Sequence, residues 1–131
     1  MSARDEASDS TAQSFEVRSE ANDGVRIIAV HGELDLSTAP ELAESLREAV
    51  SSSDAALAID FSGCGFIDST GIALLVSTRK QLNGDGRGEG PGRLALCGVS
   101  RQVRRVFDIT GLEPWMTVYP SLEEALAALR G

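Results

Sequence analysis

The chain has 131 residues, of which 42% are hydrophobic, and its formal net charge is −8 at pH 7. That length suits a single domain with one core, and no apolar run approaches the roughly 20 residues that a membrane-spanning helix needs. The acidic balance argues against direct binding to nucleic acid, and it permits a basic protein partner. We also expect no association with a membrane.

The amino-terminal third of the chain predicts a tail, a hairpin and a helix. Residues 1–13 are rich in Ser, Ala and acidic side chains without apolar periodicity, which indicates a disordered acidic tail before one domain over 14–131. Phe15–Glu20 and Val25–Val30 alternate as strands around an Asn-Asp-Gly turn. Thr38-Ala39-Pro40-Glu41 is a capping-box pattern with proline in the first turn of a helix.

The rest of the chain alternates strands with helices. Leu57–Asp60 is short and almost wholly apolar, as expected of a strand buried on both faces, and a short glycine-bearing loop follows it. The later elements are predicted to be a helix from about Ser69 to Leu82, an exposed loop at Asn83–Gly92 and a strand at Arg93–Cys97. A helix capped by Ser100 and ended by Gly111, a strand at Met116–Tyr119 and a helix opened by the capping box Ser121–Glu124 complete the chain.

This order predicts an α/β fold. We expect a mixed, mainly parallel sheet of about five strands with an antiparallel hairpin at its amino-terminal edge, and four helices. The apolar faces predict these core residues: Leu57–Ile59, Ile72, Leu75, Val76, Val103, Phe107 and Leu126.

Catalytic chemistry finds little support in the sequence. His31 is the one histidine, and Ser69 lacks the Gly-x-Ser-x-Gly setting of a hydrolase nucleophile. The segment Gly84–Gly90 lacks the Gly-Lys-Ser/Thr ending of a phosphate-binding loop, and its carboxylates would repel phosphate. We therefore expect neither catalytic residues nor an enzyme.

Metal and phosphoaspartate sites fare no better. Asp60 and Asp68 lack a recognisable set of histidine or cysteine partners for a metal. A phosphoaspartate switch at Asp60 also needs an acidic pair and a late lysine, whereas Lys80 is the one lysine and lies on a helix. Cys64 and Cys97 form no disulfide framework, which suggests a reducing cytosol. We expect no cofactor and a cytoplasmic protein.

The sequence Asp68-Ser69-Thr70-Gly71 places hydroxyl groups at the amino end of a helix. Free backbone N–H groups and the positive end of the helix dipole favour an anion there. Ser69 would serve there either as a structural cap or as a place where a phosphate is added and removed. A glycine inside a helix costs roughly 1 kcal/mol relative to alanine, which suggests that another backbone or a partner approaches Gly71 closely. The residues alone leave both roles of Ser69 open.

Two motifs resemble the STAS domain family, and in particular the bacterial anti-sigma factor antagonists. The first motif runs from Ala58 to Leu75 and includes Phe66-Ile67-Asp68-Ser69-Thr70-Gly71. The second is His31-Gly32-Glu33-Leu34-Asp35, which resembles the Gly-Glu-Leu-Asp motif before the family's first helix. The resemblance covers about residues 14–130. The loop Asn83–Gly92 is longer and richer in glycine than the family's usual connection.

The resemblance implies a phosphorylation switch. In this family the first hydroxyl after the aspartate is phosphorylated by a partner anti-sigma factor, a GHKL-type serine kinase, and that position is Ser69 here. Asp35 is then expected near Ser69 on the partner-binding face. The expected partner-binding residues are Gly32, Glu33, Asp35, Ser37, Asp68, Ser69, Thr70 and Gly71.

The expected function is to bind the anti-sigma factor and so release a sigma factor, with phosphorylation ending the binding. The protein is expected to be a monomer or a weak dimer. The alternative is a STAS domain with another task, either as a scaffold in a stressosome or as a soluble subunit of a lipid or anion transport complex.

Overall fold

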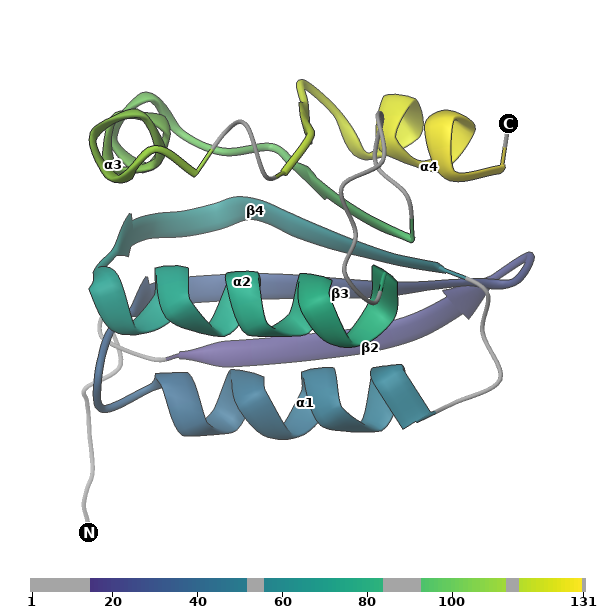
Figure 1. The fold of residues 1–131 in the computed structure, drawn as a ribbon, viewed down its shortest axis with the longest axis horizontal. Coiled ribbons are helices and arrows are strands. Elements are labelled where there is room, and N and C mark those ends of the chain that lie inside the picture. The colour runs from purple at the N-terminus through teal and green to yellow at the C-terminus, as the bar shows by residue number, and fades with distance from the viewer. Residues whose placement is uncertain (1–14, 52–55, 84–92, 113–115, 131) are drawn as a thin grey trace, which may run out of the picture.

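The computed structural model describes residues 15–51, 56–83, 93–112 and 116–130. The predicted tail and nearly all of the glycine-rich loop fall outside these residues, so both stay predictions. Within the described part, five strands and four helices follow one another in the predicted order (Figure 1): β2 (Glu16–Asn22), β3 (Val25–Leu34), α1 (Ala39–Ser51), β4 (Ala56–Ile67), α2 (Ser69–Asn83), β5 (Leu94–Cys97), α3 (Arg101–Thr110), β6 (Val118–Tyr119) and α4 (Leu122–Arg130).

The strands form one mixed sheet in the order β2-β3-β4-β5-β6. Only β2 and β3 pair antiparallel, and the other three neighbouring pairs are parallel, which confirms the predicted hairpin on a parallel sheet. The hairpin turns through Asp23 and Gly24, whose φ angles are 54° and 82°. Positive φ at both central residues matches the right-handed twist of the strands, and Asp-Gly is a preferred pair for it.

The two central strands are longer than the sequence predicted. β3 continues from Val30 to Leu34 and β4 from Asp60 to Ile67, so the segment expected as a loop is strand. The parallel pairing persists through register shifts between Ala29 and His31 and between Gly32 and Glu33. Glycine permits this, because a Cβ at Gly63 would collide with the ring of His31. Gly63, one of the glycines that suggested a loop, instead allows the two strands to pair closely.

The core lies on both faces of the sheet. Leu57 and Ile59 of β4 belong to a cluster shared with α1, α2 and α3, whereas Ala58 between them packs with Leu126 of α4. The rings of Phe61 and Phe107 meet edge to face with their centroids 6.4 Å apart. All the predicted core residues are buried except Val76, which is half-buried.

Helix caps agree with the sequence at two of three positions. The Ser100 hydroxyl accepts the Val103 N–H at 3.1 Å, and the Ser121 hydroxyl accepts the Glu124 N–H at 3.2 Å. The predicted box at Thr38 is wrong in its side-chain part. The Thr38 hydroxyl turns back to the Glu33 carbonyl at 2.7 Å, and the Glu41 N–H donates to the Thr38 carbonyl instead.

Both cysteines are free thiols buried in the core. Burial raises the pKa of the Cys64 thiol, and burial together with the nearby charge of Asp60 raises the pKa of Cys97 to about 12. The reactive thiolate form is therefore scarce at both positions near neutral pH.

Helix α3 offers a test of the core. Phe107 is fully buried and Ile109, two residues later, is 77% exposed. We expect Phe107→Ala to lower the free energy of unfolding by about 3–5 kcal/mol, because it removes a ring that packs on Phe61 and leaves a cavity. Ile109→Ala should change it by less than about 0.5 kcal/mol. Urea unfolding followed by circular dichroism measures both, and equal losses would contradict this packing.

Candidate functional site

Two turns lie side by side where β3 and β4 end. Leu34 and Ile67 are the last paired residues of these parallel strands, and the Asp68 N–H donates to the Leu34 carbonyl at 3.1 Å. Residues 35–38, here called the Asp35 turn, leave β3 and lead into α1. Residues 68–71 leave β4 and open α2. The structure thus brings together the two sequence motifs at the end of the sheet where α/β proteins commonly place their sites.

The carboxylate of Asp35 organises its own turn. Its Oδ1 accepts hydrogen bonds from the Ser37 hydroxyl at 2.8 Å, the Ser37 N–H at 3.0 Å and the Thr38 N–H at 3.2 Å. The Asp35 N–H in turn donates to the Thr38 hydroxyl at 2.9 Å. The Ser37 hydroxyl is the main reason that the pKa of Asp35 lies below its ordinary value, with the N–H donors adding to it. Asp35 is therefore a charged residue that also fixes the shape of the turn.

The locked turn exposes Leu36, which the sequence analysis did not single out. This side chain is 74% exposed, and it borders a groove of about 410 Å³ between α1 and α2. We call this the α1–α2 groove; its lining is almost wholly apolar and consists of Leu36, Ala39, Pro40, Ala43, Thr70, Ala73 and Leu74. The sequence did hold a signal for Leu36: it is an apolar residue between the polar Asp35 and Ser37 in a turn, a place where core packing does not call for an apolar side chain.

Asp68, not Ser69, caps α2. Its Oδ1 accepts the Thr70 N–H at 2.9 Å and the Gly71 N–H at 3.2 Å, which is the bonding of an N-cap residue. Ser69 is the first residue of the helix and is exposed. Within the described residues its hydroxyl has no hydrogen-bond partner. The structural-cap role that the sequence left open thus belongs to Asp68, and the Ser69 hydroxyl is free for another role.

Both glycines of the expected site have internal reasons for their small size. A Cβ on Gly71 would lie 2.7 Å from Cγ1 of Ile67 and 2.9 Å from Cγ of Leu34. The close approach predicted at Gly71 is therefore made by core side chains and not by another backbone, and a role of Gly71 in binding a partner stays a prediction. The backbone of Gly32 has a φ of 105°, a value that residues other than glycine rarely adopt.

The other predicted residues differ in their access to solvent. Glu33 and Ser37 are exposed, whereas Asp35, Asp68 and Thr70 are half-buried. His31 lies within β3, beside Gly63 of β4. Among the described residues no cluster of three or more His, Cys, Asp or Glu side chains is arranged to hold a metal, and no helix there is long and apolar enough to cross a membrane.

The fold and the paired turns define a STAS domain. The model of the STAS domain family matches residues 16–125, and the chain belongs to that family. Within it the chain falls among the bacterial anti-sigma factor antagonists. It is 32% identical over 110 residues to the anti-sigma-F factor antagonist RsfB of Mycobacterium tuberculosis, covering 84% of this chain and 85% of that protein.

Solved structures agree with this assignment. An anti-sigma factor antagonist from Mycobacterium paratuberculosis superposes with a TM-score of 0.81 at 32% identity, over 93% of this chain and 99% of that one. The anti-sigma factor antagonist SpoIIAA in its unphosphorylated form gives a TM-score of 0.71 at 27% identity, over 90% and 97%. SpoIIAA in its phosphorylated form, from Bacillus, gives 0.62 at 25%, over 87% and 97%.

The bonding of the Asp35 turn predicts a change in titration. Ser37→Ala removes the hydroxyl that does most to hold the pKa of Asp35 below its ordinary value of 3.8, so that pKa should rise toward 3.8. A carboxyl with a lowered pKa in the folded state stabilises the fold above its ordinary pKa, and this contribution is lost as the pH falls through the folded value. Ser37→Ala should therefore make the protein slightly less stable than the wild type near neutral pH, and this difference should disappear as the pH falls through the pKa of Asp35.

Side-chain carboxyl shifts followed by NMR across an acid titration measure this effect. Ser51→Ala is the matched control, because the Ser51 hydroxyl donates to the Glu48 carbonyl and bonds no carboxylate among the described residues. An unchanged Asp35 titration in Ser37→Ala would contradict the assigned cause.

Proposed function

We propose that this protein is an anti-sigma factor antagonist controlled by phosphorylation of Ser69. It binds an anti-sigma factor serine kinase of the GHKL type in the cytoplasm, and this binding releases a sigma factor. It acts as a binding protein without a cofactor and not as an enzyme. One observation carries the proposal: Ser69 presents an exposed hydroxyl at the start of α2 that bonds nothing in the part of the chain that the structure describes, while its neighbour Asp68 caps the helix.

The partner-binding surface combines charge with an apolar anchor. The Asp35 turn supplies charged and polar groups from Glu33, Asp35 and Ser37, and the α1–α2 groove supplies an apolar hollow beside Leu36. Thr70 lines that groove and is the residue next to Ser69. An apolar side chain of the partner inserted there would lie close to the modified hydroxyl. Anchors buried in such hollows usually carry most of the binding energy of an interface.

A phosphate on Ser69 acts against the complex more than against the fold. It adds about −1.5 to −2 charges at neutral pH. The Thr70 and Gly71 N–H groups that would otherwise receive an anion already bond Asp68, so the phosphate gains little from the start of its own helix. It also stands next to the Asp68 carboxylate. A partner fitted to the neutral hydroxyl would have to desolvate both charges, which is costly.

Substitution of Ser69 tests the switch. Ser69→Asp should fold with wild-type stability, because the side chain is exposed, and should bind the anti-sigma kinase at least 10-fold more weakly. Ser69→Ala should bind like the wild type and should not be inactivated by kinase and ATP. Calorimetric titration against the kinase measures the affinities, and mass spectrometry locates the phosphate.

Ser19→Asp is the control for added charge, since Ser19 is exposed on β2, away from the two turns. Tight binding by Ser69→Asp, or a phosphate found on another residue, would refute the switch.

The exposed Leu36 side chain, which a bound partner would bury, makes a separate prediction. Leu36→Ser should leave the free energy of unfolding within about 0.5 kcal/mol of the wild type, because the side chain is 74% exposed. It should weaken kinase binding by about 10-fold or more, because a buried anchor that is lost commonly costs at least about 2 kcal/mol. Calorimetry again measures the affinity. Ile109→Ser is the matched control, because Ile109 is a similarly exposed apolar residue on α3, and this variant should bind the kinase like the wild type. Wild-type affinity in Leu36→Ser would remove the groove from the interface.

A further inference from the structure

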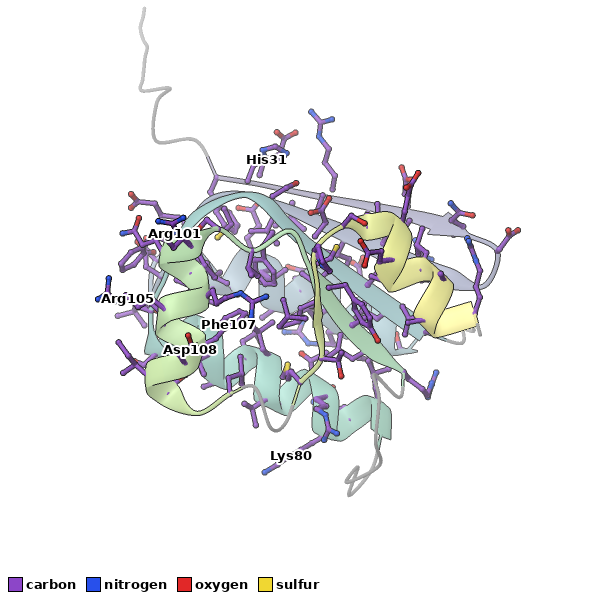
Figure 2. All side chains as sticks on the ribbon, turned by 90° about the horizontal axis from the view of Figure 1, so that it is seen from above. His31, Lys80, Arg101, Arg105, Phe107 and Asp108 are labelled. Atoms are coloured by element: carbon purple, nitrogen blue, oxygen red, sulfur yellow. The ribbon has the colours of Figure 1, made fainter. Side chains whose placement is uncertain are left out.

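A second surface, unused by the proposed function, lies on α3 and its border with α2. The outer face of α3 carries Arg101, Arg104 and Arg105, and Asp108 is the acidic residue of that helix. Figure 2 shows Arg101 and Arg105 pointing away from the body of the protein, while Phe107 of the same helix points inward. All three arginines are exposed in a chain whose net charge is −8. The basic character is thus concentrated on this helix against the overall charge.

An apolar residue continues the row of charges. Arg101, Arg105 and Ile109 are spaced four residues apart, so they follow one face of α3 at intervals of about 6 Å. Ile109 is 77% exposed, the highest value among the exposed large apolar side chains of the described residues. A large apolar side chain at the end of a basic row suits a partner that is both acidic and amphipathic.

A groove lies beside the end of this row. It has a volume of about 250 Å³ and is lined by Ile72, Val76, Lys80, Thr110, Gly111 and Leu112, and we call it the α2–α3 groove. Gly111 ends α3 with a φ of 70°, and a Cβ built there would meet nothing within 4 Å. The floor is mainly apolar, and Lys80 adds a cation from the α2 side. Lys80 therefore places a positive charge at a mainly apolar hollow beside the carboxyl end of α3.

We propose that α3 and the α2–α3 groove bind an acidic amphipathic helix of a partner protein. Acidic side chains four residues apart on such a helix match Arg101 and Arg105, and an apolar side chain on its adjacent stripe enters the groove beside Ile109. Lys80 pairs with an acidic residue at the far end. The net charge of −8 disfavours binding of long polyanions and anionic membranes through charge repulsion. A short acidic helix carries few charges and is repelled less.

The two grooves flank opposite sides of α2. Thr70, Ala73 and Leu74 line the α1–α2 groove, whereas Ile72, Val76 and Lys80 line the α2–α3 groove. The α3 surface is therefore separate from the one that phosphorylation of Ser69 is proposed to control, and its test needs neither the kinase nor the phosphate.

The test uses a stapled helical peptide with glutamates four residues apart beside a leucine stripe, titrated into the ¹⁵N-labelled full chain. We expect amide shifts confined to α3 and the α2–α3 groove, and an affinity that falls as salt rises. The double variant Arg101→Glu/Arg105→Glu should weaken binding by at least 10-fold. Arg18→Glu/Arg47→Glu makes the same charge change on β2 and α1 and should bind as the wild type does. Ile109→Ser should weaken binding, and Leu36→Ser should not.

Three results would overturn the proposal. The first is equal binding by a peptide of the same composition in scrambled order. That result would show that binding depends on the net charge of the peptide alone. The second is unchanged binding in Arg101→Glu/Arg105→Glu. The third is tighter α3-dependent binding to phosphatidylserine vesicles or to duplex DNA than to the helical peptide, which would assign the surface to a membrane or a nucleic acid.

Discussion

The candidate site depends on the parallel pairing of β3 and β4 out to their last residues. Because Leu34 pairs with Ile67 and the Leu34 carbonyl accepts the Asp68 N–H, the two turns that follow are held together by main-chain bonds. Such bonds do not depend on which side chains the turns carry. The sheet therefore keeps the two turns in a fixed relation, while Asp35 shapes its own turn and the exposed Ser69 side chain takes no part in this framework.

Glycine at a few positions makes this pairing possible. Gly63 lets β4 run under the ring of His31, and Gly71 lets the first turn of α2 settle onto Leu34 and Ile67. The same residues explain where inference from sequence failed. Gly63 looks like part of a loop when its segment is considered alone, because the side chain that requires a glycine there, His31, belongs to the neighbouring strand. The helical glycine suggested a partner for the same reason, since its neighbours come from β3 and β4.

Most of the fold follows from the sequence because its signals are local. Apolar periodicity, the Asp-Gly turn and the caps at Ser100 and Ser121 each act within a few residues, and each is found as expected. The candidate site follows from the sequence only in part. The position of Ser69 at a helix start follows from the motif, whereas the groove beside Leu36 arises from two helices that are distant in sequence. Likewise, the choice of Asp68 over Ser69 as the cap is a matter of side-chain rotation that the sequence leaves open.

The buried thiols have a practical consequence. Cys64 and Cys97 lie in the core with raised pKa values, so maleimide reagents near neutral pH find little thiolate on the folded protein. A cysteine placed at an exposed position such as 36 or 109 would then be labelled selectively in the otherwise unaltered chain. A dye at position 36 in one variant and at position 109 in another would report in real time on occupation of the α1–α2 groove and of the α3 surface separately.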